Sequence, residues 1–490
     1  MSTPEDRPSG GLASDIIGVA ALTVLAAGTR FRWLAGHAEA TGTDGYYYVV
    51  QVTDAVASGS LHVPDGSWVL WALAAVHLVI PDPVLAVKLG ASLLAAACVP
   101  AAWWAGRALG GPAASWLCAG WVVASPTLTH LAADFPKNLG ALAPFLVLVA
   151  AGARGGRAWP VAVVAGLACA TAHRTGAALV LVGAAGVVLA RVAGAVDTPV
   201  PGRRALAVVA GVVLFAGASL TQPNLLHPSD LERLVGQLRG SPWPPLPIAY
   251  ATLRPTSPLE IAEWFLPWFG LAAAAFSAAG ASARRRVLLP LVLVASVLVF
   301  PLWADGELDL GYRLMLLGPL VGVLLIAACL PPDAQLPRQT GARVLFVAML
   351  AAPYASWEGW SPSIDPPYAR WRQLIDRTPR PLPALTIAHA GLSFLVDHQT
   401  GAEALPWAPE AELDRASIGR IAWGIRDSEW VAFGARDVVR LDPDYSYLPE
   451  AEWEAFVTRA RSSDEPDLLR RLDDPRNPAR VRPSSLLRNR

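Results

Sequence analysis

The chain has 490 residues, of which 54% are hydrophobic and only 16% are charged, and its mean hydropathy is +0.40. Soluble domains carry about 25% charged residues, so this composition predicts a surface that largely faces lipid. The 39 basic residues are balanced by 39 acidic residues, which leaves no basic field for binding nucleic acid. The apolar content also excludes disorder over most of the chain.

The charges concentrate toward the C-terminal end. Residues 357–490 hold 18 of the basic and 21 of the acidic residues, about half of the charge in about a quarter of the chain. We therefore expect three parts: a cytoplasmic N-terminal tail (1–13), a transmembrane domain (14–356) and a small C-terminal α/β domain (357–490). The four cysteines each lie in an apolar stretch without metal-ligand spacing, so we expect them to be small buried residues.

Apolar stretches predict an α-helical polytopic membrane protein, because a spanning helix needs about 20 such residues. The predicted spans lie near residues 14–34, 84–108, 112–131, 138–153, 158–173, 175–192, 205–221, 262–283, 286–304, 312–331 and 342–356. The segment 67–80 is apolar but shorter, and prolines close it, which predicts an interfacial or re-entrant helix. In the C-terminal domain we expect a strand followed by a helix at 384–391, strands at 418–425 and 430–435, and a helix at 448–460.

The distribution of arginine predicts the orientation. With the N-terminus in the cytoplasm, the inner connections hold most arginines that flank the spans, including the Arg284–Arg286 cluster, as the positive-inside rule requires. Eleven spans then place residues 357–490 outside the cell membrane. Two long outer loops, 35–83 and 222–261, are where we expect function, because binding and catalytic residues concentrate on loops that a rigid scaffold positions.

The first candidate residue is Asp44, directly after the first span. A carboxylate at the membrane surface can act as a general base toward a hydroxyl group, and Tyr46 and Tyr47 beside it offer aromatic faces suited to sugar rings or headgroups. The alternative is that Asp44 only caps a helix that begins at Gly45.

The second candidate pair is Asp134 and Lys137, at the outer end of the third span. Lys137 lies near the start of the helix that Pro136 opens, where backbone N–H groups also favour anions. Lys137 would then hold a phosphate while Asp134 faces a substrate or a metal. The alternative is a simple pairing of the two side chains.

Three further residues lie at predicted outer helix ends. His173 and Arg174 occupy a tight turn, where the arginine either binds a phosphate or extends to the lipid headgroups and the histidine is a substrate-binding candidate or a hydrogen-bonded helix end. Arg313 begins a span, where the helix dipole disfavours a cation. It therefore predicts a nearby anion, unless it pairs with Asp309 of the acidic cluster at residues 305–309.

The order of these features resembles the polytopic GT-C glycosyltransferases, which use polyprenyl-phosphate-linked sugars and include protein mannosyltransferases, aminoarabinose transferases and oligosaccharyltransferase catalytic subunits. The resemblance covers residues 14–153. It rests on a first span, an outer loop with an acid, the stretch VLAVKLGASLLAAACVPAAWWAGRALGG (84–111) and a proline-containing turn with a second acid in ASPTLTHLAADFPKNLGAL (124–142). The chain has a single Asp in the first loop where many relatives have a neighbouring second acid. It also lacks the WWDYG motif of oligosaccharyltransferases, so asparagine glycosylation is not expected.

The resemblance implies a sugar transfer from a polyprenyl-phosphate donor to an acceptor hydroxyl on the outer face of the plasma (inner) membrane. Asp44 matches the acid that acts as base or orients the acceptor, and Asp134 matches the second acid. By topology, Lys137, Arg174 and Arg313 match the cations that hold the lipid phosphate. A phosphate leaving group held in this way needs no metal and no cofactor in principle. The rival predictions are a transporter or flippase of lipid-linked sugars, and an envelope polymer assembly protein.

Overall fold

The computed structural model describes residues 10–42, 44–154, 158–173, 175–180, 183, 258–277, 291, 316–331, 372, 385–388, 390–401, 404–405, 418–423, 438–441 and 445–449. Contacts divide the chain into two compact units. The first comprises Met1–Gly42 and Val52–Ile364, and the second comprises Thr43–Gln51 and Asp365–Arg490. The spans predicted at 205–221 and 342–356 lie outside the described residues, and those at 175–192, 262–283, 286–304 and 312–331 are described only in part.

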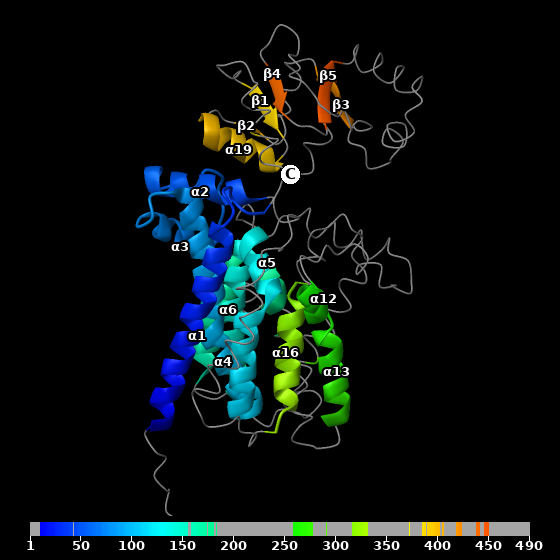
Figure 1. The fold of residues 1–490 in the computed structure, drawn as a ribbon. Coiled ribbons are helices and arrows are strands. Elements are labelled where there is room, and N and C mark those ends of the chain that lie inside the picture. The colour runs from blue at the N-terminus through cyan, green and yellow to red at the C-terminus, as the bar shows by residue number, and fades with distance from the viewer. Residues whose placement is uncertain are drawn as a thin grey trace, which may run out of the picture. The chain divides into compact units, whose positions relative to one another are not determined.

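The first unit is a bundle of apolar helices that lie side by side (Figure 1). Its long members are α1 (Gly10–Ala35), α4 (Pro83–Ala124) and α6 (Pro136–Arg154). Helix α4 packs against α1, α6 and α16 (Gly318–Cys329), and α13 (Leu266–Ser277) packs against α16. Within the described residues, four stretches are long and apolar enough to cross a membrane: Ala13–Ala35, Pro83–Ala124, Pro136–Arg154 and Leu259–Phe276. These helices mark the chain as a membrane protein.

Helix α4 reverses direction at Gly111, which has a φ of 83° and a ψ of −159°. In a straight helix, residues eight apart are separated by about 12 Å. Here a Cβ on Gly106 would instead overlap the carbonyl group of Ala114. Both ends of α4 also lie beside the last turns of α1, since Lys88 donates to the carbonyl of His37 and Arg30 donates to the carbonyl of Ser125. The hairpin therefore corresponds to the two spans predicted at 84–108 and 112–131.

The second arm of this hairpin is shorter than predicted. It ends at Ala124, and a new helix, α5 (Pro126–Asp134), begins after Ser125. Ser125 has extended backbone angles and its hydroxyl accepts the N–H of Leu128 at 3.1 Å. Since Pro126 lacks an N–H and suits the first helical position, the sequence Ser-Pro ends one helix and starts the next.

Short helices complete this end of the unit. α3 (Trp68–His77) confirms the helix predicted at 67–80, and α12 (Pro258–Trp264) packs against α5. Helix α7 (Trp159–Ala172) packs against α6. The Ser67 hydroxyl donates to the Ala172 carbonyl at 2.5 Å, which ties the start of α3 to the end of α7.

The second unit contains two small sheets. Strand β1 (Leu385–Ala388) pairs in parallel with β2 (Ala404–Leu405) and β4 (Val438–Leu441), while β3 (Ile418–Trp423) pairs antiparallel with β5 (Tyr445–Pro449). Helix α19 (Ala390–Thr400) follows β1. The strand and helix predicted at 384–391 and the strand predicted at 418–425 are found. The helix predicted at 448–460 is wrong at its first two residues, which belong to β5, and the strand predicted at 430–435 lies outside the described residues.

Candidate functional site

A buried histidine lies between two carboxylates at the end of the bundle where α1 ends. His130 on α5 is 2% exposed. Its Nδ1 lies 2.8 Å from Oε1 of Glu260 on α12, and its Nε2 lies 3.1 Å from Oδ2 of Asp134, one turn further along α5. Figure 1 shows α5 and α12 beside each other in this part of the bundle. The Glu260 side chain is 0% exposed and that of Asp134 is 19% exposed, so Asp134 is the end of this chain of groups that reaches solvent.

A second acid on α12 fixes the start of α5. Oε2 of Glu263 accepts hydrogen bonds from the Ser125 hydroxyl at 3.1 Å and from the Thr127 backbone N–H at 3.0 Å. On the other side, the buried guanidinium of Arg30 donates to the carbonyls of Val122 and Ser125 at 2.5 and 3.2 Å. The junction between α4 and α5 is thus held by the carboxyl group of Glu263 and the guanidinium of Arg30, both buried.

The loop after α1 lies directly against Asp134. Gly42 has a φ of 77°, and a Cβ at this position would overlap Oδ1 of Asp134 and the carbonyl oxygen of Ala133. The Thr41 hydroxyl also donates to that carbonyl, at 3.3 Å. Only glycine combines this left-handed backbone with such a close approach.

Both nitrogens of the His130 imidazole face acceptors, which determines its charge. His130 lies on α5, which is not one of the four stretches that are long and apolar enough to cross a membrane. Burial lowers the pKa of this imidazole, but the hydrogen bonds and negative charges of Asp134 and Glu260 outweigh it and raise the pKa to about 9. At neutral pH His130 is therefore an imidazolium that donates one N–H to each carboxylate.

The simpler interpretation of the sequence paired Lys137 with Asp134, but in the structure Lys137 pairs with another acid. Its Nζ lies 2.7 Å from Oδ2 of Asp65, in the segment before α3, and the two side chains are 16% and 5% exposed. The other oxygen of Asp65 accepts the Ser67 N–H at 2.8 Å. Lys137 is therefore a fixed cation at the first turn of α6, one turn beyond Asp134.

Asp44 directly precedes α2 (Gly45–Ser58). Its carbonyl oxygen accepts the Tyr48 N–H at 3.3 Å, so it occupies the N-cap position, and it is half-buried. The ring of Tyr46 is 1% exposed and its hydroxyl accepts a hydrogen bond from Arg372 at 3.1 Å.

Tyr47 also packs among aromatic rings, with ring centroids 5.3 Å from Tyr48 and 5.2 Å from Phe394. Both tyrosines that we singled out for sugar binding therefore have aromatic or hydrogen-bonding contacts inside the second unit.

His173 caps the helix that follows α7. Its backbone is extended, its Nδ1 accepts the Thr175 N–H at 3.2 Å, and its carbonyl accepts the Ala177 N–H at 3.1 Å. It is 8% exposed. Arg174, Arg313 and the cluster at residues 305–309 lie outside the described residues.

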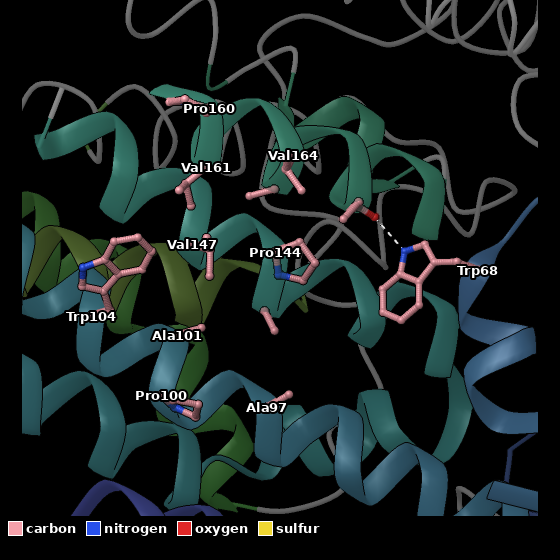
Figure 2. Close-up of a pocket in the computed structure, with 13 residues that line it drawn as sticks. Trp68, Ala97, Pro100, Ala101, Trp104, Pro144, Val147, Pro160, Val161 and Val164 are labelled. Carbon is pink, nitrogen blue, oxygen red and sulfur yellow. Dashed lines mark hydrogen bonds between the residues drawn. The ribbon is translucent and has the colours of Figure 1, made fainter. Parts of the chain in front are cut away.

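An apolar groove of about 740 Å³ runs between α4, α6 and α7. Its lining includes Trp68, Pro100, Trp104, Pro144 and Val164, and the Trp68 indole N–H is engaged by the Ala168 carbonyl at 2.8 Å (Figure 2). This lining suits hydrocarbon and offers no group for sugar chemistry. The site with chemical capacity is therefore the one around His130.

Sequence reasoning missed several residues of this site: Arg30, Asp65, His130, Glu260 and Glu263. The signals for three of them were present. His130 and Asp134 are four residues apart, and Glu260 and Glu263 are acids at the start of an apolar stretch, where an acid is costly unless it has a partner. Asp65 gave no such signal, because an acid before a helix is common.

The sequence and the fold can be compared with those of known proteins. No family model matches the sequence, and no curated protein matches it. The archaeal oligosaccharyltransferase AglB from Archaeoglobus fulgidus, in complex with an inhibitory peptide and a dolichol-phosphate, has a TM-score of 0.49 and 12% identity to this chain. The same enzyme in its apo form and tethered to an acceptor peptide has TM-scores of 0.46 and 0.47 and 11% identity.

Each match covers 81% of this chain, which spans 64% of the length of the oligosaccharyltransferase.

Proposed function

We propose that this chain is a membrane glycosyltransferase that moves a sugar from a polyprenyl-phosphate donor to an acceptor hydroxyl. The observation that carries the proposal is the buried Glu260–His130–Asp134 chain, which presents one carboxylate at the end of an apolar helix bundle. Lys137 lies one turn beyond this carboxylate. An acid for the acceptor and a cation for the phosphate, at the end of membrane helices, are the two groups that the reaction needs.

In the proposed reaction the acceptor oxygen attacks the anomeric carbon from the face opposite the phosphate. The bond between that carbon and the phosphate oxygen breaks, polyprenyl phosphate leaves, and Asp44 takes the hydroxyl proton. Asp134 accepts a hydrogen bond from the substrate and orients it.

The leaving phosphate gathers negative charge in the transition state, and preorganised cations stabilise it. Lys137 is our first candidate, and Arg174 and Arg313 complete the proposed set. The proposed substrate-binding residues also include His173, which precedes Arg174. Tyr46 and Tyr47 are proposed for the aromatic faces that they offer to sugar rings or headgroups. The proposed topology has residues 1–13 in the cytoplasm and residues 357–490 outside the plasma membrane.

The position of the buried charges favours a transferase over a transporter. Transporters place charged binding sites near the bilayer midplane. Arg30 lies five residues before the end of α1 and Lys88 lies five residues after the start of α4, which places each α-carbon about 8 Å from its helix end. The charges of the described site thus gather at one end of the bundle.

The test is an assay of purified protein in proteoliposomes with a polyprenyl-phosphate donor that carries a radiolabelled sugar. We expect label to appear on an added acceptor in step with the release of polyprenyl phosphate. Transfer of intact donor between the leaflets with no labelled acceptor would show a flippase instead.

Lys137 can be tested apart from its structural pairing. Lys137→Gln leaves the buried Asp65 without its cation, so we expect a loss of stability together with a rise in the KM for the donor. The double variant Lys137→Gln/Asp65→Asn restores a neutral amide pair and with it the stability. If Lys137 holds the phosphate, the KM of the double variant stays raised by roughly 10–100-fold, the value of a hydrogen bond to a charged group. A normal KM in the stable double variant would assign Lys137 to the pairing alone.

A further inference from the structure

Glu260 contributes a carboxylate that no helix-packing requirement explains. It is fully buried on α12, and burying a carboxylate costs several kcal/mol unless it is paired. Its Oε1 lies 2.8 Å from Nδ1 of His130, 130 residues away in the sequence. An apolar residue at each position would fill the same space, so the charged pair points to a purpose other than packing.

Solvent exposure rises along the series Glu260, His130 and Asp134 from its buried end to its open end. Glu260 is 0% exposed and His130 is 3% exposed in their side chains, while Asp134 is 19% exposed. The imidazole therefore connects a closed, fixed anion to an open one. Because an imidazole donates from both nitrogens only when it is a cation, Glu260 favours the form of His130 that also donates to Asp134.

The base of this arrangement is rigid. Glu263, one turn along α12 from Glu260, is hydrogen-bonded to Ser125 and Thr127. This contact joins α12 to the start of α5, so Glu260 and His130 keep their relative positions. The ring of Phe135 stacks on the His130 imidazole at a centroid distance of 6.5 Å and an interplanar angle of 16°.

We propose that His130 is a positioning residue for the transfer reaction, which acts through Asp134, and that Glu260 sets its orientation and its charge. The Nε2–H of His130 fixes Oδ2 of Asp134. The second oxygen, Oδ1, lies against Gly42, and the proposal assigns it the hydrogen bond to the substrate. This inference rests on the proposed glycosyl transfer. It adds two residues, on different helices, to the machinery of the site.

The raised pKa of His130, about 9, gives the proposal a measurable consequence. Within the described residues, the titratable groups that face the imidazole are Asp134 on its own helix and Glu260 on α12, with Glu263 beyond Glu260. The other helices that pack against α5 also carry cations. Lys88 on α4 and Lys137 on α6 are held by the His37 carbonyl and by Asp65, while Arg107 on α4 and Arg154 on α6 lie over the rings of Trp103 and Trp104. Above pH 9 the neutral imidazole loses one donor, so we expect the turnover number to fall there.

The experiment compares the pH dependence of kcat in the wild-type protein with that in Glu260→Gln. The amide of Gln can still accept the Nδ1–H, but it removes a negative charge, which lowers the pKa of the imidazole by about one unit or more. We therefore expect the alkaline limb of the Glu260→Gln profile to move down by about one pH unit or more, with the KM for the donor unchanged. The control is Glu263→Gln, a buried acid on the same helix, which should reduce thermal stability but leave the alkaline limb in place.

The outcomes separate the two proposals. If Glu260→Gln has the wild-type limb, or if both variants move it equally, His130 has no positioning role even though the transfer is real. If wild-type protein transfers no sugar at any pH, the proposed function fails and the inference fails with it. A further variant, His130→Gln, keeps one neutral N–H donor for Asp134 but has no imidazole to titrate. Its pH profile of kcat should therefore lack the alkaline limb near pH 9, and its kcat should fall by about 10²-fold, the cost of a misplaced reacting group.

Discussion

Asp44→Asn protein should insert and fold normally while losing transfer activity by roughly 10²–10⁴-fold, the contribution that a general base makes. The fold should survive because Asp44 occupies the N-cap position of α2, where Asn is as favourable as Asp. The activity should not survive, because an amide cannot take the proton of the acceptor hydroxyl. Initial rates at saturating donor and acceptor measure the effect.

The matched control for this prediction is Asp82→Asn. Asp82 is the N-cap of α4, where its side chain accepts the N–H groups of Val84 and Leu85 at 2.8 and 3.1 Å. The chemical change and the structural position are the same, but Asp82 lies outside the proposed site, so its variant should transfer sugar at the wild-type rate. Near-normal turnover by Asp44→Asn would mean that Asp44 is only a cap and would move the base to Asp134.

Asp134→Asn should cause the second large loss, about 10²-fold or more in kcat. His130 donates to Asp134 through Nε2–H, so the Asn side chain must turn its carbonyl oxygen toward the imidazole. Its NH₂ group then takes the place of the second carboxylate oxygen. A contact that accepted a hydrogen bond from the substrate becomes a donor, while the helix and its hydrogen bond to His130 are kept.

The thermal unfolding of Asp134→Asn protein in detergent is the check on its fold, and we expect a small change in its midpoint. Turnover within a few-fold of wild type in such a folded protein would show that Asp134 only completes the charge pairing of His130. Glu260 would then be the functionally silent end of a structural ion pair.

Sequence patterns predicted the parts of the fold that depend on local composition. The apolar stretches near 14–34, 84–108 and 138–153 correspond to α1, the first arm of α4 and α6, because a membrane helix satisfies its own backbone hydrogen bonds. The break at Ser125 was missed, since the predicted span was extended through residues 126–131 although Thr127, Thr129 and His130 are polar. The Ser-Pro capping signal marks the new helix. The site was predicted in part: Asp134 and Lys137 were named, but their partners were not.

Those partners were missed for a physical reason. Asp65 reaches Lys137 across 72 residues and Glu260 reaches His130 across 130, and no local pattern encodes such pairs. The same holds for Gly42, whose importance comes from the approach of Asp134 rather than from its neighbours in the sequence. Tertiary contacts of this kind appear only when the helices are assembled.

The location of the phosphate site is the central claim, and one labelling measurement tests it most directly. A polyprenyl phosphate with a photoreactive group next to its phosphate would be irradiated with the wild-type protein in membranes, and the labelled peptides identified by mass spectrometry. We expect the label on the segment from α5 to the first turn of α6, residues 126–140, and we expect unlabelled polyprenyl phosphate to compete it away. Competable label found only on the lining of the apolar groove between α4, α6 and α7, with none near Asp134 and Lys137, would contradict the proposed site.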